Sequence, residues 1–152
     1  MQDTSELIPH RGRWRIAQRV VSIDGLTAVC EGDFDEAFVD GHFPGQPIVP
    51  GVALLEGLAQ SMLALSQTLA AAGAATEAES EGTPFLAGFD KVRFRAPVFP
   101  PATVTFTVKI TEQRAGLTRA SGTATWNGKR VCTAQLTGVV IAPPPEDGAP
   151  TA

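Results

Sequence analysis

The chain has 152 residues, of which 43% are apolar, and a formal net charge of −4. This length and composition suit one domain with a true hydrophobic core and exclude disordered and fibrous proteins. The acidic balance argues against a dedicated nucleic-acid binder, which would normally have a basic excess. We expect a single domain over residues 1–142 and a disordered Pro/Ala-rich tail over residues 143–152.

Basic residues are concentrated in two short stretches. Seven of the twelve Lys and Arg residues lie there: Arg11, Arg13, Arg15, Arg19, Lys91, Arg93 and Arg95. If the two stretches meet in space, they form a cationic patch on an acidic protein. The alternative is that they are scattered, solvated charges.

The cysteines and the longest apolar run indicate where the protein works. Cys30 and Cys132 are the only cysteines, and the polar N-terminus has no signal peptide, which predicts reduced thiols in the cytoplasm. Both lie in strand-like segments and are expected to be small buried side chains. The apolar run over residues 52–75 contains Glu56, Gln60 and other polar residues, so we expect a buried helix and no membrane span.

The first elements in chain order are a hairpin and a loop. Residues 15–23 and 26–34 are strand-like, and Asp24-Gly25 between them is typical of a hairpin turn. Residues 40–51, DGHFPGQPIVPG, contain prolines and glycines that exclude both helix and strand.

A helix is expected to begin at Gly51, because the sequence there becomes rich in Ala, Leu, Met and Gln. The helix is apolar nearly all round, so other structure must enclose it. One stripe of small residues would let a sheet approach closely: Ala53, Gly57, Ser61 and Ala64. Residues 73–82 are small and polar and predict a loop.

Four further strands are expected, around residues 92–95, 104–110, 117–126 and 130–141. Their period-two alternation predicts an antiparallel sheet with one polar face, and Asn127-Gly128 supplies a tight turn. The fold class is therefore α+β, with a curved antiparallel sheet wrapped around one long central apolar helix.

Three features near the helix start are suited to acid–base chemistry. His42 is neutral near pH 7 and can accept a proton. Glu56, in the second turn of a largely buried helix, is expected to hold a proton that it can donate. The free N–H groups of Gly51 and Val52 would stabilise a developing oxyanion. A base, an acid and an oxyanion site are what α-proton abstraction with loss of a β-hydroxyl group requires.

Each of these residues also has a structural interpretation. A loop histidine such as His42 is more often a structural hydrogen-bonding group than a catalyst, and Glu56 could face solvent or pair with an arginine. Gln60, one turn later, is either a partner of Glu56 or a hydrogen-bonding group of the core. Two distant histidines and two separate cysteines have no metal-ligand spacing, and no phosphate-binding loop is present, so no metal and no cofactor are expected.

Residues 41–60, GHFPGQPIVPGVALLEGLAQ, closely resemble the signature of the FabZ-type (3R)-hydroxyacyl-[acyl carrier protein] dehydratases. That signature has HFPG-x-P-x-x-PG-V followed by a helical E-x-x-AQ. Every fixed position is present here, and Glu56 stands fourteen positions after His42. LIPHR over residues 7–11 and FLAGFDKVRFRAPV over residues 85–98 also match, and the similarity extends over about residues 7–141.

The resemblance implies a hot-dog fold and a homodimer or trimer of dimers, with the histidine of one subunit facing the glutamate of the other. His42 would take the C2 proton, and Glu56 of the partner chain would assist departure of the C3 hydroxyl group as water. The Gly51 amide would hold the thioester oxygen. Some relatives have a cis peptide bond after the catalytic histidine, which implies one at His42-Phe43.

The resemblance also implies that the substrate is carried on an acyl carrier protein. This acidic protein would dock on the bases Arg11, Arg93 and Arg95, and the attraction should weaken as the salt concentration rises. Two alternatives on the same scaffold stay open, an acyl thioesterase and a non-catalytic acyl-binding module.

Phe43, Phe85 and Gln60 are expected to line or gate an apolar tunnel for the acyl chain. Phe85 corresponds to a tyrosine that gates this tunnel in some relatives, and the chain contains no tyrosine. Residues 100–102, Pro-Pro-Ala, stand where the family commonly has Pro-Gly-Asp, and Gln18 stands where an aspartate is common.

Overall fold

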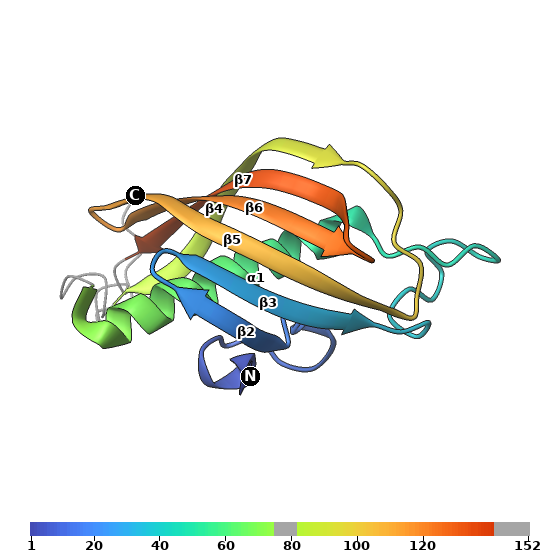
Figure 1. Cartoon of the computed structure of the whole chain (residues 1–152), viewed down its shortest axis with the longest axis horizontal. Helices are drawn as coiled ribbons and strands as arrows, with labels where there is room; N and C mark the ends of the chain where they lie inside the picture. Colours follow the sequence, from blue (N-terminus) through green and yellow to red (C-terminus); the bar gives the residue numbers. More distant parts are fainter. Residues whose placement is uncertain (75–81, 142–152) are drawn as a thin grey trace, which may run out of the picture.

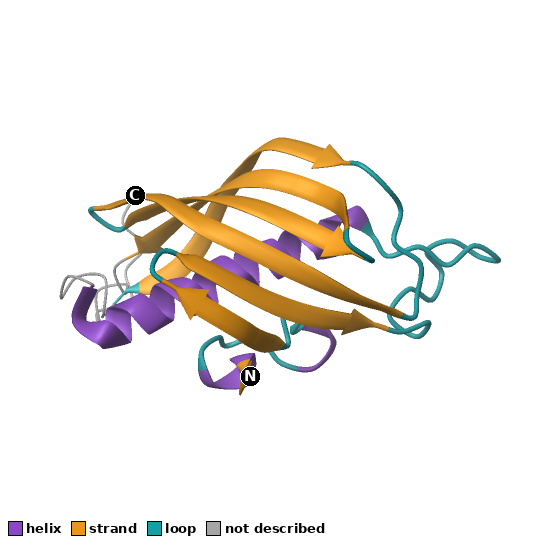
Figure 2. Cartoon of the chain, viewed as in Figure 1, coloured by secondary structure: helices purple, strands orange, loops and turns teal. Residues whose placement is uncertain are grey.

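The computed structural model describes residues 1–74 and 82–141 of the chain. One long helix, α1 (Gly51–Leu69), packs against a seven-stranded sheet in the order β1-β2-β3-β5-β6-β7-β4, with every neighbouring pair antiparallel. The sheet curves around the helix, as Figures 1 and 2 show. This α+β arrangement confirms the fold class predicted from the sequence.

The strands are β1 (Gln2–Asp3), β2 (Arg19–Asp24), β3 (Thr27–Phe34), β4 (Thr83–Phe94), β5 (Ala102–Arg114), β6 (Leu117–Trp126) and β7 (Lys129–Ile141). Two 3-10 helices, η1 (Thr4–Glu6) and η2 (Gly12–Trp14), precede β2, and a π-helical turn, η3 (Ala70–Ala74), continues α1. Both predicted hairpins are confirmed. The second turns at Asn127-Gly128 as expected, but the first turns at Gly25-Leu26, one position later than the predicted Asp24-Gly25, because Asp24 still pairs with Thr27.

The first predicted strand is shorter than expected. It begins at Arg19 instead of residue 15, because the N–H groups of Ile16 and Ala17 do not enter a strand ladder. They donate to the side-chain oxygen of Gln60 on α1, at 2.8 and 3.0 Å. A side chain from the helix therefore replaces strand pairing at this point.

The strand expected around residues 92–95 is longer than predicted and begins at Thr83. β4 pairs with β7 from Thr83↔Ile141 to Phe94↔Cys132, but the register shifts twice along the way. These irregularities break the period-two alternation on which the prediction depended. Of the predicted loop over residues 73–82, residues 75–81 lie outside the described residues, as does the predicted tail over 143–152.

The stripe of small residues on α1 allows the close approach that was predicted. A Cβ atom added to Gly57 would lie 2.3 Å from Cζ of Phe106 on β5, so only glycine fits there. Alternate side chains of β5 are buried under the helix: Val104, Phe106, Val108 and Ile110. Cys30 and Cys132 are buried as expected. In the described part of the chain, no helix is long and apolar enough to cross a membrane.

Candidate active site

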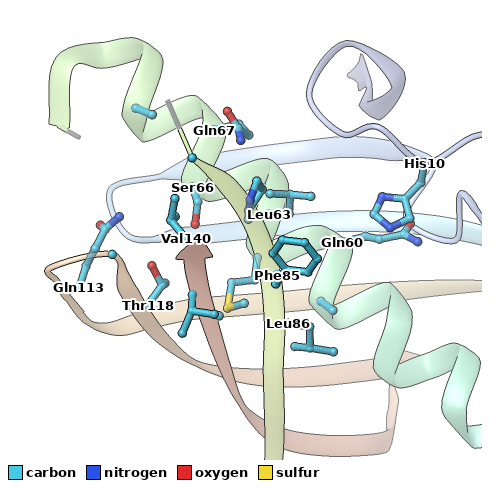
Figure 3. Close-up of a pocket in the computed structure, with 18 of the residues that line it drawn as sticks. His10, Gln60, Leu63, Ser66, Gln67, Phe85, Leu86, Gln113, Thr118 and Val140 are labelled. Atoms are coloured by element: carbon cyan, nitrogen blue, oxygen red, sulfur yellow. The ribbon is translucent and has the colours of Figure 1, made fainter. Parts of the chain in front are cut away.

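A cavity of about 580 Å³ lies beside α1, walled on its other side by β4 and the ends of β5, β6 and β7. Glu56 and Gln60 line it from the helix, and Phe85 lines it from β4. Figure 3 shows His10 and Gln60 at one end of this view, Gln113 and Thr118 at the other, and Phe85 between them. The fold thus brings the predicted acid together with two of the predicted tunnel residues.

Gln60 holds Glu56 in place. Its Nε2 donates to Oε1 of Glu56 at 2.7 Å and to the carbonyl oxygen of Trp14 at 2.6 Å. The Gln60 side chain is buried, and its oxygen accepts the two N–H groups that interrupt the first predicted strand. Gln60 therefore fills both roles that the sequence left open, as a partner of Glu56 and as a hydrogen-bonding group of the core.

His10 is a second neighbour of Glu56, which was not expected from the sequence. Its Nε2 lies 3.3 Å from Oε1 of Glu56, and the two side chains are 31% and 30% exposed. His10 also lines the cavity. The available signal was its place in the LIPHR block, one of the three blocks that resemble the dehydratase family.

The loop before α1 fixes the ring of His42. Its Nδ1 lies 2.9 Å from the carbonyl oxygen of Ile48, and because a carbonyl can only accept, Nδ1 carries the hydrogen. The ring stacks on Phe43, with centroids 4.3 Å apart. The peptide bond between His42 and Phe43 is cis, as the resemblance implied. His42 therefore holds its lone pair on Nε2, the arrangement that a general base requires.

The N-terminus of α1 is uncapped within the described chain. Pro50 is the N-cap residue and makes no side-chain hydrogen bond, so the first amides of the helix have no side-chain acceptor. A Cβ atom on Gly51 would lie 2.7 Å from the ring of Phe94, which explains the glycine at this position. Val52 is 72% exposed. Donors that remain free at a helix start can bind an anionic oxygen.

A single chain does not assemble all of these groups around one cavity. Within the described residues, the cavity wall includes Glu56 but none of His42, Phe43, Gly51 and Val52. Phe43 is 56% exposed at the surface of its loop. One copy of the chain therefore presents Glu56 in a cavity whose wall does not include the half-buried His42.

The two basic stretches differ in their surroundings. Arg19 pairs with Asp33 at 2.7 and 3.0 Å and holds the pKa of that carboxyl group below its ordinary value. The guanidinium group of Arg11 donates to backbone carbonyls, those of Ser5, Ile8 and His10. By contrast, Arg93 and Arg95 are exposed and form no ion pair with the described acids.

Solved structures share this fold at low sequence identity. The dehydratase heterocomplex ApeI:P from Xenorhabdus doucetiae is similar with a TM-score of 0.73 and 16% identity, over 93% of this chain and 92% of that one. A hypothetical thioesterase protein with coenzyme A from Streptococcus pneumoniae TIGR4 is similar with a TM-score of 0.62 and 11% identity, over 82% and 85% of the two chains. At these identities the likeness concerns the fold alone, which is the predicted hot-dog fold.

Sequence comparison is more specific. The 3-hydroxyacyl-[acyl-carrier-protein] dehydratase FabZ of Roseiflexus sp. (strain RS-1) is 36% identical over 140 residues, which cover 90% of this chain and 92% of that protein. The protein of the same name from Yersinia enterocolitica serotype O:8 / biotype 1B is 36% identical over 139 residues, covering 90% and 80%. The model of the FabA-like domain matches residues 8–135. The chain therefore belongs to the FabA-like family and is related within it to the FabZ dehydratases.

Proposed function

We propose that this protein removes water from (3R)-3-hydroxyacyl thioesters carried on acyl carrier protein and forms trans-2-enoyl thioesters, in fatty-acid or related acyl-chain biosynthesis. The observation that carries the proposal is the carboxyl group of Glu56, held at the wall of a cavity in a chain 36% identical to named dehydratases over 90% of its length. The reaction takes place in the cytoplasm, a compartment that the two free, buried cysteines favour.

The elimination divides between two residues. Nε2 of His42 takes a proton from C2, and the electrons of the broken C–H bond form the C2–C3 double bond. The C3–O bond breaks, and Glu56 gives its proton to the departing hydroxyl group, which leaves as water. The amides of Gly51 and Val52 stabilise the negative charge that develops on the thioester oxygen. Proton exchange with solvent then returns imidazolium and carboxylate to their starting states.

A homodimer, alone or as the unit of a trimer of dimers, completes this site. β4 is the last strand of the sheet order and carries three exposed apolar side chains on a free edge: Phe85 at 52%, Leu86 at 41% and Phe94 at 54% exposure. An apolar edge strand of this kind pairs with other chains unless it is covered. A second copy on this edge would cover it and bring the His42 loop of one subunit to the Glu56 cavity of the other.

The acyl carrier protein docks on a basic surface formed by Arg93, Arg95 and Arg11. The first two are exposed and without acidic partners in the described chain, so their charge is available to an acidic carrier. Arg11 adds its charge, although its N–H groups are donated to backbone carbonyls. The acyl chain enters the cavity past Phe43 in the His42 loop of the other subunit, and Phe85 occupies the position of the gate.

A direct assay tests the function. Purified protein is mixed with 3-hydroxybutyryl and longer 3-hydroxyacyl carrier-protein thioesters, and formation of the conjugated enoyl thioester is followed by absorbance. The proposal predicts dehydration, and hydration of the enoyl thioester in the reverse direction. Release of free thiol from a saturated acyl thioester would instead identify a thioesterase. Tight binding with no turnover in either direction would identify a non-catalytic acyl-binding protein.

A further inference from the structure

We propose that His10 is a positioning residue that acts together with Gln60 to select which oxygen of Glu56 carries the catalytic proton. The two residues place their donors on Oε1 and leave Oε2 to hold the proton that protonates the leaving hydroxyl group. The catalytic meaning of this arrangement depends on the proposed dehydratase function.

The orientation of the Gln60 amide is fixed by the backbone. Its oxygen accepts hydrogen bonds from the N–H groups of Ile16 and Ala17, at 2.8 and 3.0 Å, and only an oxygen can accept them. The atom that faces Glu56 is therefore the amide nitrogen, which donates to Oε1 at 2.7 Å. This donor does not depend on the protonation state of any other group.

His10 adds a second donor to the same oxygen. Its Nε2 lies 3.3 Å from Oε1 of Glu56, within ion-pair distance of the same oxygen that accepts from Gln60. None of the described residues donates a hydrogen bond to Oε2 of Glu56. In a carboxylic acid, the oxygen that accepts a hydrogen bond from Gln60 and faces His10 is suited to be the carbonyl oxygen, which leaves Oε2 as the hydroxyl oxygen of the acid form. After that proton leaves, the same two donors stabilise the carboxylate.

The rest of the His10 ring makes no competing polar contact. Its Nδ1 is buried and has no hydrogen-bond partner among the described residues. A histidine that only joined two parts of the fold would use both ring nitrogens, because an unpaired buried polar atom is costly. Arg11 holds the backbone on which the ring is carried, because it donates to the carbonyl oxygens of His10 at 2.8 Å and Ile8 at 2.7 Å.

Two variants distinguish a hydrogen-bond donor at position 10 from a side chain that only fills space there. His10→Gln keeps an N–H donor at a similar reach, whereas His10→Leu keeps a similar volume and has no donor. We expect His10→Leu to lower kcat about 10- to 100-fold with KM changed less than about twofold, because the lost interaction serves the acid in the transition state. His10→Gln should keep kcat within about threefold of the wild type.

Three results would overturn the proposal. They are an unchanged kcat in His10→Leu, a rise in KM in place of the loss in kcat, and a His10→Gln variant as slow as His10→Leu. Circular dichroism and gel filtration of both variants show whether fold and assembly are intact. If the wild-type protein itself has no dehydratase activity, the proposed function is contradicted and these kinetics cannot test the role of His10. A second measurement therefore does not depend on activity.

Nitrogen-15 NMR of the imidazole rings supplies that measurement. The chain has two histidines, so the spectrum of His10→Leu assigns both rings. The proposal predicts that neutral His10 carries its hydrogen on Nε2 alone, whatever the activity of the sample. A hydrogen on Nδ1, or a mixture of the two tautomers, would contradict it, because Nε2 could then not be a constant donor to Glu56.

Discussion

In the proposed mechanism, His42 and Glu56 each offer one reactive atom, because the other polar atom of each side chain has a partner. In His42, the hydrogen bond from Nδ1 to Ile48 leaves the lone pair on Nε2. In Glu56, Oε1 accepts the hydrogen bond from Gln60 and lies next to His10, whereas Oε2 has no hydrogen-bond partner among the described residues and is the atom that we propose carries the proton. Acid–base catalysis at neutral pH requires such fixed tautomers, since a group that presents the wrong atom cannot react.

The cysteines take no part in this chemistry, and their burial makes a prediction about pH. Burial raises the pKa of Cys132 to about 11 from the ordinary 9.0, and it also raises the pKa of Cys30. At pH 8 we expect no reaction of the native protein with a thiol reagent that needs a thiolate, and reaction of both thiols in denaturant. Rapid labelling of the native protein would contradict this account.

The same shift affects stability at alkaline pH. Above pH 9 the unfolded chain loses its thiol proton while the folded chain retains it, so the free energy of unfolding should fall as the pH rises from about 9 towards 11. Urea unfolding at several pH values measures this dependence. In Cys132→Ala, where the group is absent, the dependence on pH should be smaller.

Among the elements, those with regular local patterns could be predicted. α1 begins at Gly51 as expected, and β6 covers residues 117–126 as predicted, because nothing interrupts the periodicity of either segment. β4 was predicted too short because its irregular register hides the alternation, and β2 was predicted too long because a distant glutamine takes two of its N–H groups. Contacts between elements cannot be deduced from local periodicity.

The contact between α1 and β5 leads to a prediction at the level of these elements. Gly57→Ala should lower the free energy of unfolding by about 1–3 kcal/mol, because the new methyl group would overlap the buried ring of Phe106. This loss outweighs the gain of about 1 kcal/mol from the better helix propensity of alanine. Urea denaturation measures it. Gln67→Ala, on the exposed side of the same helix, is the control and should stay within about 0.5 kcal/mol of the wild type. A Gly57→Ala variant as stable as the wild type would contradict the packing described.

At the level of the whole molecule, the arrangement of the site could not be predicted from sequence periodicity. A histidine and a glutamate at positions 42 and 56 suggested acid–base chemistry, but the proposed pairing of the two residues between subunits came from the resemblance to the dehydratases. The structure of one chain agrees with a shared site, since the cavity that contains Glu56 lacks His42. His10 was missed because its partner stands far along the sequence, on the central helix.

Carrier-protein docking is also a property of the whole surface. We expect the double variant Arg93→Glu, Arg95→Glu to raise KM for a carrier-protein substrate about tenfold or more, with little change for a small pantetheine thioester. Added salt should likewise raise the KM of the wild-type protein for the carrier-protein substrate and change the KM for the pantetheine thioester little. The control is Arg119→Glu, whose side chain is 57% exposed and paired with Glu112. Equal losses on both substrates would exclude a docking role for these arginines.

The shared site is tested most directly by mixing two inactive subunits. His42→Ala and Glu56→Gln should each be folded but lose most activity alone. In a mixed dimer, one of the two sites would hold both intact residues, so co-expression of the two variants should restore about a quarter of wild-type activity for random pairing. Native mass spectrometry verifies that mixed dimers form. If verified mixed dimers are as inactive as either variant alone, His42 and Glu56 do not act across two chains.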